Sequence, residues 1–319
     1  MKRLPLVLAA ASVLALSICA HAAEPYRFKG TVTITVPFNA GSNTDMQMRF
    51  LQPYLEKHLG TKTIVVNAGG AAGVIGVSGY INQKKNGSNV LFSLPSPTVY
   101  KPSTGATPYK VSDLIPVAQV TASPFYLAVS GENEQFKDAA SVLAFIKENP
   151  GQFTYANAGN GGIAHLAFAS FVHGEGLDAI SVPFTGGTSD CYTALMGGHV
   201  MSHAVSETEL VGRSDVRPLI NLGTKSSTEG FEDIPTLAEL GYDGYVTDTF
   251  AGFYYMKGVK DEVVKAFEAA VKATLEDEEF IAAAKAANFK HHYVGAEDFA
   301  AKIADTVKAV TPVLQAINK

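Results

Sequence analysis

Short apolar, β-branched runs alternate with longer segments of helical periodicity along the first part of the chain. The runs at residues 31–37, 63–67 and 89–94 predict strands, and the segments at 43–59 and 73–84 predict helices. Strands that alternate regularly with helices are typical of a parallel sheet covered by helices. The pattern therefore predicts an α/β fold.

The same alternation returns in the middle of the chain. Its predicted elements are strands at 153–157, 179–183 and 199–205 and helices at 141–148, 164–173 and 189–196. An extended, Pro-containing stretch at 115–129 and an irregular Gly- and Asp-rich passage at 241–249 separate the two series. We interpret both as crossings between two α/β lobes with a hinged cleft: residues 23–122 plus 246–319 form lobe 1, and 123–245 form lobe 2.

Apolar residues form stripes on the predicted helices. In the helix over 43–59 the stripe contains Met46, Phe50, Tyr54, Leu55 and Leu59. Asn43 or Thr44 is expected to cap this helix, and Asp45 lies in its first turn, where the helix dipole favours a negative charge. Two further amphipathic helices in the tail, around 263–275 and 299–314, are expected to cover a sheet.

The first 22 residues have the pattern of a secretory signal peptide. Lys2 and Arg3 precede an apolar stretch at 4–18, and small residues follow at Ala20 and Ala22. We expect cleavage after Ala22 and a periplasmic product. A membrane anchor is the first alternative, but the apolar run is shorter than the roughly 20 residues needed to span a bilayer. A lipoprotein attached through Cys19 is the second, and the bulky Ile18 just before that cysteine disfavours it.

Charge and cysteine content exclude several classes of protein. The chain carries 25 Lys and Arg against 30 Asp and Glu, a formal charge of -5, and no long basic run, which argues against nucleic-acid binding. Once the signal segment is removed, Cys191 is the one remaining cysteine, so no intramolecular disulfide is expected.

Motifs of enzymes, cofactor sites and metal sites are missing or incomplete. The sequence has no HExxH, P-loop or GxSxG motif. Residues 159–164 loosely match a dinucleotide-binding pattern, but no acidic residue ends the next predicted strand to bind a ribose hydroxyl. His199 and His203 share one strand face without an obvious third ligand. We expect no catalysis, no cofactor and no bound metal.

One kind of loop occurs four times: a strand ends in Pro or Asn, small residues follow, and a helix begins. The four loops are residues 37–45, 67–73, 157–162 and 183–188. Small residues let a ligand reach backbone N–H groups at helix N-termini, where the dipole favours an anion. Ordinary strand-to-helix turns are the alternative for any single loop. Two loops in each predicted lobe indicate a cleft that binds a carboxylate or a phosphate.

Five motifs in order make the chain resemble a known family, the periplasmic substrate-binding proteins of tripartite tricarboxylate transporters, called TctC or Bug receptors. The motifs are Val36-Pro37-Phe38 followed by Gly41 and Asp45, Asn67 to Gly76, Tyr155 to His165, Val182 to Gly187, and Leu195 to Val200.

The resemblance implies a type II-like periplasmic binding protein fold, in which two lobes close on a ligand like a Venus flytrap. It also implies a monomer that delivers a small organic acid, such as a carboxylate, to the membrane permease subunits of a tripartite tricarboxylate-type transporter. The implied ligand-binding residues of lobe 1 are Phe38, Asn39, Ser42, Asn43, Asp45 and, at a later strand end, Ser93. Those of lobe 2 are Ala158, Gly159, Asn160, Gly161, Gly162, His165, Thr185, Gly186, Gly187, Ser206 and Glu207.

Several alternatives stay open. The same fold also suits an extracytoplasmic ligand sensor, and an exported enzyme would use Asp45, His165 or Cys191. Asp45 also suits the role of a helix-dipole partner, and His165 that of a packed helix residue. Because the loops contain no clear Arg or Lys, backbone dipoles are expected to hold the ligand, and mono- and dicarboxylates, aromatic acids and amino acids all remain candidates.

Overall fold

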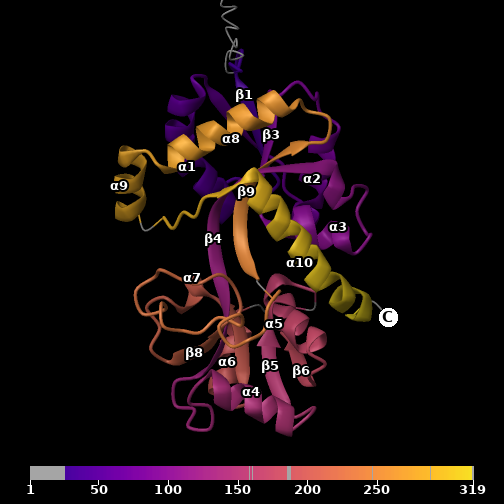
Figure 1. Cartoon of the computed structure of the whole chain (residues 1–319), viewed down its shortest axis with the longest axis vertical. Helices are drawn as coiled ribbons and strands as arrows, with labels where there is room; N and C mark the ends of the chain where they lie inside the picture. Colours follow the sequence, from indigo (N-terminus) through magenta and orange to yellow (C-terminus); the bar gives the residue numbers. More distant parts are fainter. Residues whose placement is uncertain are drawn as a thin grey trace, which may run out of the picture.

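The computed structural model describes residues 26–317 except positions 158, 160, 185–187, 246 and 288. The predicted signal peptide, residues 1–22, lies outside the described residues. Figure 1 shows two lobes, one above the other, with β4 and β9 running between them.

The first lobe is built on three parallel strands in the order β2-β1-β3. They are β1 (Val32–Val36), β2 (Thr63–Asn67) and β3 (Asn89–Ser93), and the helices of this lobe include α1 (Asn43–Leu59), α2 (Val74–Ile81) and α8 (Asp261–Leu275). The short turn η1 (Ala71–Gly73) leads into α2. Val32, Ile34 and Val36 are buried because helices cover the sheet.

The second lobe repeats this plan. Its strands are β5 (Phe153–Asn157), β6 (Ala179–Pro183), β7 (Ser202–Ser206) and β8 (Val216–Asn221), and its helices are α4 (Ala139–Glu148), α5 (Ile163–Gly174), α6 (Thr188–Met196) and α7 (Glu207–Leu210). β5 pairs in parallel with β6 and with β7. The parallel α/β pattern predicted for both halves of the chain is therefore confirmed.

Two strands connect the lobes. β4 (Leu114–Ser130) pairs antiparallel with β9 (Asp248–Met256) as far as Pro124, and from Phe125 onward it pairs with β7 and β8. β4 thus belongs to the sheet of the first lobe at one end and to that of the second lobe at the other. This arrangement confirms the predicted two-lobe fold. The second connecting strand, β9, begins at Asp248, near the end of the predicted crossing at 241–249.

The C-terminal part returns to the first lobe and then contacts both lobes. The predicted tail helices are α8 and α10 (Ala296–Ile317); α9 (Glu278–Ala286) and the short strand β10 (Val294–Gly295) were not predicted. Phe299 of α10 packs edge-on against Phe250 of β9. The later turns of α10 lie beside α5 of the second lobe (Figure 1).

The buried face of α1 differs from the predicted stripe. Met48, Leu51, Leu55 and Leu59 face the core, whereas Met46 is 56% exposed. Phe50 and Tyr54 instead pack against Phe280 of α9. The periodicity of α1 fits two adjacent faces, and the unpredicted α9 covers the second of them.

The cap of α1 also differs from the prediction. Ser42, and not Asn43 or Thr44, is the N-cap, and its Oγ accepts a hydrogen bond from the Asp45 N–H at 3.3 Å. Ser42 is the last extended residue before the helix, which is the geometry that lets a side-chain oxygen reach the first-turn N–H groups.

The connection between β3 and β4 forms short helical turns that the sequence pattern did not predict. They are the π-helical turn η2 (Ser96–Tyr100), the single helical turn α3 (Lys101–Ser103) and the 3₁₀ turn η3 (Val111–Asp113). Because this connection leaves the carboxyl end of a parallel strand, it lies on the edge of the sheet where α/β proteins bind ligands.

Candidate functional site

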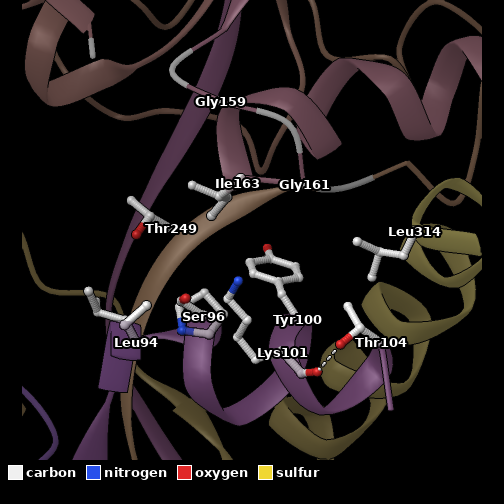
Figure 2. A pocket seen from close by; sticks show the side chains of 13 residues that line it. Leu94, Ser96, Tyr100, Lys101, Thr104, Gly159, Gly161, Ile163, Thr249 and Leu314 are labelled. Carbon is white, nitrogen blue, oxygen red and sulfur yellow. Dashed lines mark hydrogen bonds between the residues drawn. The ribbon is translucent and has the colours of Figure 1, made fainter. Parts of the chain in front are cut away.

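A cavity of about 390 Å³ lies between the two lobes (Figure 2). The first lobe lines it with Ala72, Leu94, Pro95, Ser96, Tyr100, Lys101, Thr104 and Leu314, and the second lobe with Gly159, Gly161, Gly162 and Ile163. Thr249 of the crossing strand β9 completes the lining. Since both lobes contribute, a ligand here would bridge them.

A second cavity of about 390 Å³ adjoins the first, because Leu94 and Thr249 line both. Its other lining residues are Asn43, Met46, Gln47, Phe50, Thr121, Ala122, Ser123, Thr208, Ala287, Phe289 and Lys290. The two cavities are neighbouring parts of one interlobe cleft.

The N-terminus of α5 faces the first cavity. Gly159 and Gly161 have φ angles of +123° and +71°, a backbone region that glycine adopts without the penalty of a Cβ atom. Gly162 is the N-cap, and the turn places the 12-residue helix with its N-terminal end at the cavity. The first-turn N–H groups of a helix lack intrahelical acceptors, and together with the dipole they attract an anion.

The buried side chain of His165 supports this turn from inside the protein. Its Nδ1 accepts a hydrogen bond from the Gly161 N–H at 3.0 Å, and its ring stacks on Tyr155. The side chain is 4% exposed, and burial lowers its pKa to about 4. At neutral pH the imidazole is therefore neutral, with its proton on Nε2. His165 is placed to position the glycine turn, and it is absent from the cavity lining.

The opposite wall contains polar groups that the sequence pattern did not single out. Figure 2 shows Tyr100 and Lys101 projecting into the cavity from the segment after β3. Tyr100 is buried, whereas Lys101 is exposed and carries a positive charge. The predicted loops contain no clear cation, but this neighbouring segment supplies one. The one sequence feature that could have indicated this segment is its position just after a predicted parallel strand.

Asp45 organises the first glycine-containing loop from inside the protein. It is 2% exposed and accepts hydrogen bonds from the Gly41 N–H at 2.8 Å, Asn67 Nδ2 at 3.0 Å and Arg49 Nε at 3.0 Å. Burial alone would raise the pKa of this carboxyl, but the hydrogen bonds and the Arg49 charge outweigh burial and hold the pKa below its usual value. Asp45 thus joins α1, the loop and the end of β2.

The other first-lobe residues predicted for the site take different positions. Phe38 packs against the core, and Asn39 is exposed. Asn39 lies so close to Gly69 that a Cβ atom on Gly69 would stand 2.0 Å from the Asn39 Oδ1. Asn43, next to the Ser42 cap, lines the second cavity.

The residues predicted at later strand ends form hydrogen bonds within the protein. Ser93 Oγ donates to the Leu94 carbonyl at 3.1 Å, and Ser206 Oγ donates to Glu209 at 2.7 Å. The Glu207 carboxylate accepts from Tyr126 at 2.8 Å and from Thr228. Of these three described residues, none lines either cavity.

Five of the predicted site residues lie outside the described residues: Ala158, Asn160, Thr185, Gly186 and Gly187. The three described glycines of the same second-lobe loops, Gly159, Gly161 and Gly162, all line the first cavity.

The chemistry of the described side chains offers little to a metal or a nucleophilic reaction. Within the described ranges, no group of three or more His, Cys, Asp or Glu side chains is placed to hold a metal ion. Cys191 is buried, and burial raises the pKa of its thiol to about 11, which disfavours the reactive thiolate. In the same part of the chain, no helix is long and apolar enough to cross a membrane.

Comparison with known proteins gives consistent matches over most of the chain. A family model described as "Tripartite tricarboxylate transporter family receptor" matches residues 47–319. A UPF0065 protein of Cupriavidus necator is 27% identical over 316 residues, which cover 98% of this chain and 95% of that protein. The protein BugT of Bordetella pertussis is 29% identical over 239 residues, covering 73% of this chain and 72% of BugT.

Solved structures share the fold. A TctC solute-binding protein from Polaromonas, solved without ligand, has a TM-score of 0.80 and 28% identity, and the match covers 90% of this chain and 98% of that one. An R. palustris protein solved with adipate has a TM-score of 0.63 and 21% identity, covering 88% and 96% of the two chains. MatC of Rhodopseudomonas palustris, solved with malate, has a TM-score of 0.61 and 20% identity, covering 89% and 98%.

The two-lobe fold, the interlobe cleft and the family match over residues 47–319 agree with one another. The chain belongs to the tripartite tricarboxylate transporter receptor family, TctC, whose members are periplasmic solute-binding receptors and not enzymes.

Proposed function

We propose that this protein binds a small organic acid between its lobes and delivers it to the membrane permease subunits of a tripartite tricarboxylate-type transporter. The observation that carries the proposal is the first cavity, where the N-terminus of α5 faces Tyr100 and Lys101 of the other lobe. The two related-fold proteins solved with adipate and malate support the choice of a carboxylate.

The local charge favours an anion although the whole chain has a net charge of -5. Among the described residues that line the two cavities, Lys101 and Lys290 are cationic and none is acidic. Charges farther away than a Debye length of about 8 Å at physiological salt are largely screened. A cavity of about 390 Å³ also lies within the usual range for small-molecule sites, roughly 300–1,000 Å³.

Residues 23–122 with 246–319, and residues 123–245, are the proposed moving bodies of a periplasmic monomer released from its signal peptide after Ala22. Each lobe offers only part of the site, so a ligand that contacts both favours the closed form. The closed form is then the form that the permease recognises. Small-angle scattering should show a smaller radius of gyration with a saturating, verified ligand. An unchanged radius would contradict closure.

The binding proposal is tested with the mature chain, residues 23–319, in a thermal-shift screen of mono-, di- and tricarboxylates and aromatic acids, with isothermal titration of each hit. Ligand at 100 times its Kd stabilises the folded state by about 2.7 kcal/mol, which raises the melting temperature of a chain of this size by several degrees. The amide of each acid is the uncharged control. A folded, ligand-free protein that binds none of the acids would contradict the proposed function.

A further inference from the structure

The hydroxyl of Tyr100 is buried without a hydrogen-bond partner among the residues that the structure describes. The Tyr100 side chain is 4% exposed. Other buried tyrosines of this protein are paired: the Tyr80 hydroxyl donates to the Tyr254 carbonyl at 3.0 Å, and the Tyr255 hydroxyl donates to the Gly87 carbonyl at 3.1 Å. A buried hydroxyl that lacks a partner is unfavourable unless something else supplies one.

The Tyr100 side chain lines the cavity between the lobes. Figure 2 shows the Tyr100 ring standing in the cavity with its oxygen directed toward the side formed by Gly161 and Ile163. Burial raises the pKa of the phenol, so it remains a protonated donor at neutral pH. The donor and the N-terminus of α5 therefore approach the same space from different lobes.

We infer that Tyr100 is a ligand-binding and specificity-determining residue, whose hydroxyl donates a hydrogen bond to an oxygen of the acid that the α5 N-terminus holds. This inference rests on the proposed function and identifies a first-lobe contact for it. The hydroxyl is paired only when ligand is bound. Tyr100 thus provides a first-lobe contact that makes binding depend on both lobes.

The lining also defines the class of acid. Beside the polar groups, the cavity presents the apolar side chains of Leu94, Pro95, Ile163 and Leu314. No acidic side chain is among the described residues that line either cavity, and the undescribed residues of the second-lobe loops are Ala158, Asn160, Thr185, Gly186 and Gly187, which carry no acid either. An ammonium group would be desolvated without a counter-charge, which is costly. The ligand is an organic acid with a hydrocarbon body and no amino group.

The test uses the variant Tyr100→Phe, which removes only the hydroxyl, and pairs of ligands that differ by one amino group. Isothermal titration would use succinate, adipate and hexanoate, each beside its 2-amino counterpart: aspartate, 2-aminoadipate and norleucine. The wild-type protein should bind at least one acid, and the amino counterpart should bind at least about 10-fold more weakly. Tyr100→Phe should weaken binding of that acid by about 10- to 100-fold, the range expected when a hydrogen bond to a charged group is lost.

Melting temperatures of the unliganded proteins test the unpaired hydroxyl separately. Tyr100→Phe should keep or raise the melting temperature, because it removes a buried polar atom without a partner. The matched control Tyr80→Phe should lower it, because the Tyr80 hydroxyl is hydrogen-bonded to a backbone carbonyl. It should leave affinity unchanged, because Tyr80 is absent from the lining of both cavities.

The outcomes separate the two proposals. A wild-type protein that binds an acid equally well after Tyr100→Phe would overturn the role of Tyr100 and leave the proposed function standing. An amino counterpart that binds as tightly as its acid would overturn the ligand class. A fall in melting temperature for Tyr100→Phe as large as that for Tyr80→Phe would overturn the unpaired hydroxyl. Absence of binding by every acid would overturn the proposed function, and the inference with it.

Discussion

Tyr100 and Lys101 are neighbours in the chain but act on an anion through different physics. The buried Tyr100 offers a directional hydrogen bond, whereas the exposed Lys101 offers a charge in contact with water. Interactions of exposed charges are weak, with a median of roughly 0–1 kcal/mol, and they decrease as salt is added. Lys101 should therefore make a small contribution to ligand affinity, and Tyr100 should make a larger one.

Replacement of the lysine tests this difference. Lys101→Met should weaken carboxylate binding by up to about 5-fold at low ionic strength, and the effect should vanish near 0.5 M salt because the charge is screened. Titration calorimetry at two salt concentrations measures it. Lys84→Met is the control, since Lys84 is also exposed but absent from the cavity lining. A loss that persists undiminished at high salt would contradict a role through charge.

His165 makes the stability of the protein depend on pH. Its pKa is lowered from 6.5 to about 4 in the folded state, so the unfolded chain binds the proton more readily. The corresponding stability is fully present above pH 6.5 and is lost progressively as the pH falls from there to about 4.

A variant without the titrating ring isolates this contribution. His165→Gln keeps an acceptor for the Gly161 N–H. Between pH 7.5 and 5, the wild-type protein should lose about 2 kcal/mol more unfolding free energy than the variant, as the linkage relation requires for this pKa shift. Urea denaturation at both pH values measures the difference. Equal losses would show that His165 titrates normally in the folded protein.

At the scale of elements, the N-terminal turn of α5 is the best-defined part of the anion site. It depends on glycines in a positive-φ conformation, on the Gly162 cap and on the bond from Gly161 to His165. A Cβ atom built on Gly161 would stand 3.8 Å from Leu314, which lines the cavity on the other side. The glycine backbone conformation therefore shapes the start of α5, and the same turn forms part of the cavity surface.

Two alanine substitutions separate these roles. Gly161 and Gly198 have φ of +71° and +69°, so each change to alanine should cost roughly 1–2 kcal/mol of stability for the left-handed backbone. Gly161→Ala should also weaken ligand binding several-fold, because its methyl group enters the cavity. Gly198→Ala, in the turn after α6, should leave affinity unchanged. Chemical denaturation and titration of both variants provide the comparison, and equal effects on affinity would contradict a specific role of the α5 turn.

At the scale of the whole molecule, a buried carboxylate where β9 begins links the lobes. The Asp248 carboxylate is fully buried, pairs with Lys302 of α10 at 2.5 Å and accepts a hydrogen bond from the Thr224 N–H at 2.8 Å. Lys302 also donates to Gln119 of β4 at 3.0 Å. Thr224 follows β8 of the second lobe, so one carboxylate connects a first-lobe helix to second-lobe backbone.

Loss of one partner should destabilise the whole chain. Lys302→Met leaves the Asp248 charge buried and unpaired and should cost about 3–5 kcal/mol, whereas the double variant Asp248→Asn/Lys302→Met should recover much of that loss. Lys308→Met, at an exposed position on the same helix, should cost little. Urea denaturation measures all three. A double variant no more stable than Lys302→Met would contradict an unpaired charge as the cause.

The local pattern of apolar and polar residues was sufficient to predict most of the strands and helices. The strands β1, β3 and β5 and the extended segment of β4 were predictable because burial on a sheet demands runs of apolar residues. The edge strands β2 and β6 are less buried and were predictable from their β-branched residues. The family resemblance rested on loop motifs, which are also patterns of neighbouring residues. The elements that pattern missed, such as η2, α3 and α9, are short, and tertiary contacts stabilise them more than periodicity does.

The order of residues alone thus specifies that two α/β lobes form and that glycine-rich turns precede their helices, because backbone conformation and hydrophobic periodicity are properties of neighbouring residues. Which side chains face the cleft depends instead on tertiary packing. Packing turned Asp45 and His165 inward as supports and brought Tyr100, Lys101 and Leu314 to the α5 turn. Contacts between residues far apart in the chain depend on how the lobes and α10 pack together, and no local pattern encodes that arrangement.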